Sequence, residues 1–205
     1  LRAQLFRAQG DLAASVVAAR AAADQAFRAT DGSALERGRL IGSGATSLLL
    51  AGELDGAIEL TNRAETVWSK AGVAINIASR VNAANRANAL FLRGDLADAL
   101  AAFDAIDART DSTESPPARA ARDLTHAKLL ALLGRGGEAV PLADAAINAM
   151  CDSTGATSVE CLRARLATID TRYYAGQPQQ AQAELARIGD ALAAQPPLAA
   201  AVAAF

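Results

Sequence analysis

Apolar positions recur along most of the chain with the period of an α-helix, and glycine-centred breaks interrupt them at regular places. The stretch LFLRGDLADALAAFDAI, residues 90–106, is an example, with apolar runs on both sides of Gly94 and Asp95. A residue that adopts positive φ at low cost can end one helix and let the next begin. The pattern therefore predicts two helices that meet at a tight turn and form a hairpin.

The same pattern recurs along the chain. Turn glycines stand at positions 10, 52, 94, 134 and 176, with spacings of 42, 42, 40 and 42 residues. A period of roughly 20 to 50 residues is typical of a solenoid of stacked repeats. Five positions after each glycine is a small residue that allows close helix packing: Ser15, Ala57, Ala99, Ala139 and Ala181. We expect repeats over approximately 1–30, 31–72, 73–115, 116–155 and 156–195, with the start of another at 196–205.

Helix boundaries follow from the turn residues. We expect helices over 11–29, 32–51, 54–71, 73–93, 96–108, 117–133, 136–151, 157–175 and 178–194, with a half helix at 1–9 and another beginning at 197–205. The chain is thus expected to be a fragment of a larger protein that begins and ends within a repeat. Ser115 before Pro116, and Gln177 before Pro178, suit an N-cap and a first helical position. Asn76 is placed inside the helix 73–93.

This unit resembles the tetratricopeptide repeat (TPR), in the long-period form known from kinesin light chains and from many bacterial regulators. Three sets of residues match the family pattern: the turn glycines Gly52, Gly94 and Gly134, the second-helix alanines Ala57, Ala99 and Ala139, and the first-helix small residues Ala45, Ala87 and Ala127. The family's first-helix Trp and Leu positions differ here, reading Ile41 with Gly44, Ala83 with Arg86, and Asp123 with His126. The resemblance implies an all-α fold over 1–205, a single array forming a right-handed α-solenoid of antiparallel helical hairpins.

Composition agrees with helix and limits the partners. Alanine is abundant and aromatic residues make up only 4% of the chain, which favours helix over sheet. The formal net charge of -2 argues against a nucleic-acid partner, because proteins that neutralise many phosphates normally carry a basic excess. Charged or polar residues break every apolar run before the roughly 18 residues of a membrane span, so no span is expected in this region. The bias toward alanine and arginine suggests a bacterial genome rich in GC.

Candidate catalytic residues are few. The single histidine, His126, lies mid-helix, and the sequence places no Ser or Cys nucleophile beside it. The glycine-rich stretch IGSGATS, residues 41–47, lacks the lysine and the preceding strand of a phosphate-binding loop. Two cysteines without a nearby histidine are too few for a zinc site. We therefore expect no enzymatic activity, no cofactor and no bound metal.

Cys151 and Cys161 leave two alternatives open. One lies near the end of a predicted helix and the other near the start of the next, so a disulfide could join them. Two reduced, partly buried thiols are the alternative, and we favour it together with a cytoplasmic location. A disulfide would place this region outside the reducing cytosol.

A polar face provides the candidate binding residues. Asn82, Asn85 and Asn88 lie three residues apart, close to one face of a helix. The resemblance implies that first helices line a concave groove, where asparagines and basic residues hold the backbone and carboxylates of peptides. The groove candidates are Arg39, Ser43, Asn82, Asn85, Asn88, Thr125, Lys128 and Arg163. Arg39, Lys128 and Arg163 outnumber Asp170, which predicts an acidic ligand. The alternative is a solvated helix face without a ligand.

These observations predict a non-enzymatic scaffold module that binds a peptide or protein, inside a larger bacterial regulatory or signalling protein. One alternative is a sensor domain for a small molecule that gates an attached kinase or transcription regulator. It would need a closed, apolar-lined pocket in place of an open polar groove. The other is a structural or oligomerisation segment, which predicts a large exposed apolar patch and association with a second copy.

Overall fold

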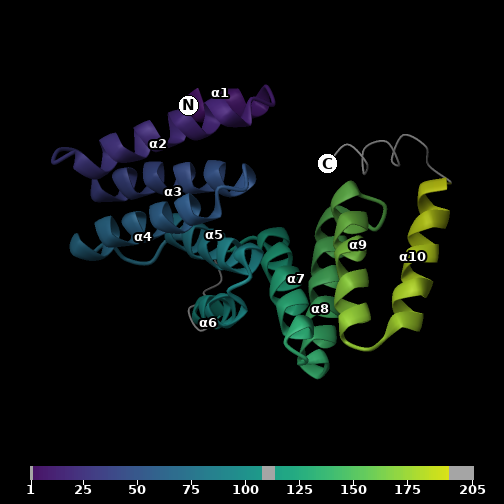
Figure 1. The fold of residues 1–205 in the computed structure, drawn as a ribbon. Coiled ribbons are helices and arrows are strands. Elements are labelled where there is room, and N and C mark those ends of the chain that lie inside the picture. Colours follow the sequence, from purple (N-terminus) through teal and green to yellow (C-terminus); the bar gives the residue numbers. More distant parts are fainter. Residues whose placement is uncertain (1, 108–113, 194–205) are drawn as a thin grey trace. The chain divides into compact units, whose positions relative to one another are not determined.

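The computed structural model describes residues 2–107 and 114–193, and within these ranges it consists of α-helices without a strand (Figure 1). The all-α class is thus confirmed. The helices are α1 (Arg2–Ala8), α2 (Leu12–Arg28), α3 (Ala34–Leu50), α4 (Leu54–Lys70), α5 (Ile77–Arg93), α6 (Leu96–Asp107), α7 (Pro116–Leu132), α8 (Gly136–Thr154), α9 (Val159–Tyr174) and α10 (Pro178–Ala193). The helix predicted to begin at 197 lies outside the described residues.

Most predicted helix ends agree with the structure within two residues, and α5 is an exception. It begins at Ile77, and not at 73, because Asn76 caps it and does not lie inside it. The Asn76 side chain accepts a hydrogen bond from the Ser79 backbone N–H at 3.1 Å, and the Ser79 hydroxyl accepts one from the Asn76 N–H at 2.9 Å. This reciprocal capping box fixes the first turn. The second exception is α8, which continues past 151 to Thr154 and ends at Gly155, whose φ is 95°.

The predicted turns are confirmed. All five turn glycines have positive φ between 77° and 93°. The small residue five positions later is buried in every hairpin. Pro116 and Pro178 begin α7 and α10 as expected. Repeat spacing therefore predicts both the turn and the close contact of the helices on either side of it.

The chain divides into two compact units, Leu1–Thr110 and Asp111–Phe205, called unit 1 and unit 2 below. In unit 1, each helix packs against the next along the chain, α3 also contacts α5, and α2 contacts α4. Its core includes the fully buried Ile41 and Leu48 of α3 and the buried Trp68 of α4. Trp68 lies directly over Gly38, where a Cβ atom would overlap the indole ring. Glycine at 38 therefore permits the close packing of α3 and α4.

Unit 2 packs α7 against α8 and α9, α8 against α9, and α9 against α10. A disulfide joins Cys151 at the end of α8 to Cys161 in the first turn of α9, with Cα atoms 4.7 Å apart. Our preference for free thiols is therefore wrong. The positive φ of Gly155 reverses the chain, and Ser158 caps α9 by accepting a hydrogen bond from the Cys161 N–H at 3.0 Å. These two local features bring the second cysteine to the first.

No described helix is both long enough and apolar enough to span a membrane.

Candidate functional site

Three of the predicted groove residues, Ser43, Asn85 and Asn88, lie on neighbouring helices of unit 1 together with Thr46. Ser43 and Thr46 are one turn apart on α3, and Asn85 and Asn88 are one turn apart on α5. The Asn85 amide Nδ2 donates to the Thr46 hydroxyl at 2.9 Å, and that hydroxyl donates to the Gly42 carbonyl at 3.2 Å. We call the surface formed by Ser43, Thr46, Asn85 and Asn88 the amide face. The structure thus brings together residues that the repeat spacing had aligned.

Asn88 forms no side-chain hydrogen bond within the described part of the chain, and its Oδ1 is buried. Val81 and Leu92 lie four residues away on either side of the Asn85–Asn88 pair, on the same stripe of α5. They are 53% and 61% exposed, which is high for apolar side chains. The stripe on α5 therefore has a polar centre and apolar ends.

Asn82 does not lie on the amide face, contrary to our expectation. It is only 3% exposed, and its Nδ2 donates to the Thr61 carbonyl of α4 at 2.9 Å. Its Oδ1 lies beside Gly42 of α3, where a Cβ atom would be 3.2 Å away. Asn82 therefore connects three helices and has a structural role.

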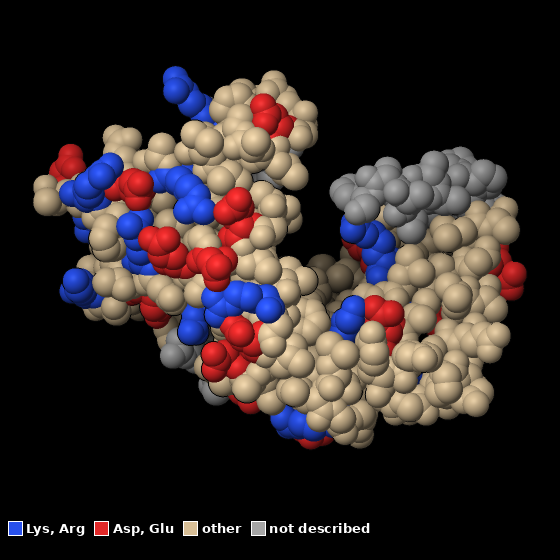
Figure 2. All heavy atoms as spheres, viewed as in Figure 1, with Lys and Arg blue, Asp and Glu red and all other residues tan. Residues whose placement is uncertain are grey.

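The predicted basic surplus is reduced by ion pairs. Arg39 pairs with Glu36 on its own helix at 3.0 Å. In unit 2, Lys128 of α7 pairs with Asp170 of α9 at 2.6 Å. On the face seen in Figure 2, basic and acidic side chains are intermixed over unit 1. Free positive charge is therefore a weaker basis for ligand binding than the sequence suggested.

The remaining candidates lie in unit 2. Thr125 is one turn before Lys128 on α7, and its hydroxyl donates to the Ala121 carbonyl of the same helix at 3.3 Å. Arg163 is exposed on α9. The predicted groove residues thus fall into two groups, one in each unit.

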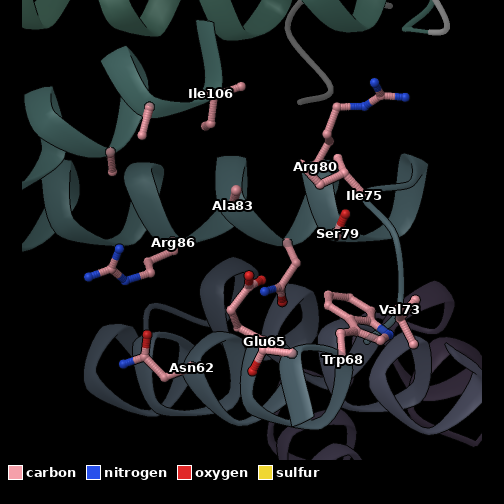
Figure 3. A pocket seen from close by; sticks show the side chains of 14 residues that line it. Asn62, Glu65, Trp68, Val73, Ile75, Ser79, Arg80, Ala83, Arg86 and Ile106 are labelled. Atoms are coloured by element: carbon pink, nitrogen blue, oxygen red, sulfur yellow. The ribbon is translucent and has the colours of Figure 1, made fainter. Parts of the chain in front are cut away.

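Unit 1 also contains a cavity of about 360 Å³ that sequence reasoning did not find (Figure 3). It lies between α4, α5 and α6, and we call it the α5 pocket. Residues that line it include Glu65, Trp68, Ser79, Ala83, Arg86 and Ile106. The signal in the sequence was the departure from the TPR pattern at 83 and 86, where the family carries large apolar residues.

A second, wider hollow of about 880 Å³ lies between α1, α2 and α3. Its lining is mostly apolar and includes Leu5, Val17 and Leu40, which are 56%, 69% and 45% exposed.

Comparisons with known proteins concern the fold. No protein-family model matches the chain, and no curated protein matches it by sequence. Two crystal structures of nearly identical TPR-like repeats, from a Podosopora anserina protein described as a kinesin light chain, are similar to it. One, a variant, has a TM-score of 0.70 at 19% identity and covers 95% of this chain and 93% of that one. The other has a TM-score of 0.67 at 20% identity and covers 94% and 93%. The chain has a TPR-like helical-repeat fold.

Proposed function

We propose that unit 1 is a non-catalytic binding module that holds an extended segment of a protein or peptide on the amide face. The observation that carries this proposal is the stripe on α5, where Asn85 and Asn88 are flanked by the exposed Val81 and Leu92. An asparagine amide offers two donors and an acceptor, which suit the backbone of an extended peptide. The apolar residues at both ends would bury ligand side chains, and about 25 cal/mol is gained for each Å² of apolar surface removed from water.

The chemical character of the ligand follows from the same surface. Because Arg39 and Lys128 are ion-paired, we propose recognition through backbone and apolar side chains first. An acidic ligand stays a prediction. We further propose that the module belongs to a larger bacterial regulatory or signalling protein, on the basis of its TPR-like fold and its composition.

A peptide-display selection tests the proposal without a known partner. A random-peptide library would be selected against the protein, and the affinity of a selected peptide measured by calorimetry. Replacing Asn85 and Asn88 together with Ala should weaken binding about five- to 150-fold, since each lost hydrogen bond to peptide groups costs about 0.5–1.5 kcal/mol. Asn62→Ala with Asn148→Ala is the matched control, because both asparagines are exposed and lie outside the amide face. Equal affinities of the two double variants would contradict the proposal, and neutralising acidic residues of the peptide would test the acidic preference.

The hollow between α1, α2 and α3 favours a second candidate function, association with another copy of the chain. The exposed Leu5 and Val17 would be buried in such a contact. Sedimentation at rising concentration should show a dimer that Val17→Lys abolishes. A monomer at every concentration would remove this candidate.

We also propose that the protein works in an oxidising compartment, because Cys151 and Cys161 form a disulfide. The loop between them is short, with a sequence separation of 10, and closing it should contribute about 2–3 kcal/mol to the stability of unit 2. Dithiothreitol should lower the melting temperature of the wild type, whereas a Cys151→Ser, Cys161→Ser variant should not respond. Alkylation of both thiols in freshly lysed cells would place the protein in a reducing compartment.

A further inference from the structure

The α5 pocket lies at a repeat position where α3 and α5 carry residues of different size. In α3, Ile41 lies eleven residues before the turn glycine and is fully buried. Ala83 has the same place in α5, and it is only partly buried. An alanine in place of isoleucine leaves the space of three carbon atoms unfilled, and closely packed interiors rarely leave such space. The alanine at this position therefore adds to the open space of the pocket.

Two unpaired charges line the pocket from facing helices. Glu65 extends from α4 and Arg86 from α5 (Figure 3). Within the described part of the chain, neither side chain forms a hydrogen bond or an ion pair, and the two do not pair with each other. Both charges are therefore available to a ligand in the pocket.

The rest of the wall is mixed: apolar residues line it together with polar ones, among them Arg80, Ser79 and Asn82. Trp68 of α4 and Ile106 of α6 are both buried, and both line the pocket. In Figure 3, Arg86 lies on the left and Trp68 to the right of the centre, with Glu65 between them. The volume of about 360 Å³ falls at the lower end of the range of small-molecule sites, which is roughly 300–1,000 Å³.

We infer that the α5 pocket binds a small zwitterion, an α-amino acid with an apolar side chain. Its carboxylate pairs with Arg86, its ammonium with Glu65, and its side chain packs against the apolar wall of Trp68 and Ile106. Arginine suits the carboxylate because its planar guanidinium donates two parallel hydrogen bonds. This site is separate from the amide face and does not depend on the peptide-binding proposal.

The chain supplies its own probe for this site, since Trp68 is its only tryptophan. Its fluorescence would be titrated with L-leucine, with 4-methylpentanoate, which lacks the ammonium, and with 3-methylbutylamine, which lacks the carboxylate. Calorimetry would accompany each titration. We expect saturable binding of leucine that is about tenfold or more tighter than that of either analogue, because each analogue loses one charged hydrogen-bonding group.

Variants assign each group of the ligand to a residue. Arg86→Gln should weaken the binding of leucine and of 4-methylpentanoate about tenfold and leave the binding of 3-methylbutylamine unchanged. Glu65→Gln should weaken the binding of leucine and of 3-methylbutylamine about tenfold and leave that of 4-methylpentanoate unchanged. Ala83→Leu should abolish binding of all three compounds by filling the pocket. If Ala83→Leu loses the helical circular dichroism signal, Ala105→Leu on the α6 side of the pocket is used in its place. The controls Arg187→Gln and Glu160→Gln alter exposed charges in unit 2 and should bind as the wild type does.

Three results would overturn the inference. One is the absence of both heat and fluorescence change with leucine, phenylalanine and valine up to their solubility limits. Another is leucine binding that survives filling of the pocket. The third is an affinity for leucine no greater than that for its singly charged analogues.

Discussion

The first helices of two hairpins in unit 1, α3 and α5, carry different residues at equivalent positions. Fourteen, eleven and eight residues before the turn glycine, α3 has Gly38, Ile41 and Gly44. At the same positions α5 has Arg80, Ala83 and Arg86. Gly38, Ile41 and Gly44 are all buried, whereas Arg86 is exposed and lines the α5 pocket. The same backbone unit therefore gives a filled interior in one hairpin and an open one in the next.

These differences change how closely the neighbouring helices approach α3 and α5. A Cβ atom on Gly44 would be 3.2 Å from Leu60 Cδ1 of α4 and 3.3 Å from the Ala19 carbonyl of α2, so glycine allows these helices to approach. At the equivalent position, Arg86 lies between α4 and α6, and no described residue of α4 has its Cα within 8 Å of one in α6. Repeat spacing determines where helices run, and the side chains at these positions determine whether a cavity remains.

The largest effect is expected from exchanging the central residues of this comparison. Ile41→Ala should destabilise unit 1 by about 2–5 kcal/mol, because it removes fully buried methyl groups and leaves a cavity. The reverse change in α5, Ala83→Ile, should alter stability by less than about 1 kcal/mol, since the added atoms enter space that is already open. Urea unfolding followed by circular dichroism measures both. A similar loss in the two variants would mean that the α5 pocket is as tightly packed as the core of α3.

A smaller effect is expected at Gly38. Gly38→Ala places a methyl group on the Trp68 indole, so the ring must move, at a cost of about 1–3 kcal/mol. The fluorescence of Trp68 should change with it. Gly189→Ala in α10 is the matched control, because a Cβ there meets nothing within 4 Å and helix propensity should add about 0.5–1 kcal/mol. If both changes stabilise the protein, α3 and α4 do not require glycine for their contact.

The comparison also shows what a sequence can predict. The turns at Gly52 and Gly94 were predictable because they depend on the local backbone conformation of a glycine that recurs at a fixed spacing, and not on contacts with distant side chains. The face of Asn82 was not, because each step of three residues turns the side chain by about 60°, so Asn82 and Asn88 differ by about 120°. That is enough to bury Asn82 and leave Asn88 half-buried. The α5 pocket depends on space between α4 and α6, which are distant in sequence. The disulfide depended on the positive φ of Gly155, which residue spacing alone does not give.

The smallest effect is expected from the ion pair that joins α2 to α4. Arg63 Nη1 lies 2.6 Å from Asp24 Oδ1, and the guanidinium also lies over the Phe27 ring, 5.0 Å from its centroid. The hydrogen bond from Arg63 holds the pKa of Asp24 below its ordinary value of 3.8, more than offsetting partial desolvation. A carboxyl with a lowered folded-state pKa stabilises the protein above its unfolded-state value and loses that contribution as pH falls through the folded-state value.

Stability of the wild type should therefore decrease more steeply than that of Asp24→Asn as pH is lowered below 3.8. Urea midpoints at pH 7 and at successively lower pH measure the difference, and high salt should reduce it because the pair is partly exposed. Asp152→Asn, at an exposed carboxyl in unit 2, is the control. Parallel pH profiles for the wild type and Asp24→Asn would mean that this ion pair adds nothing measurable to the contact of α2 and α4.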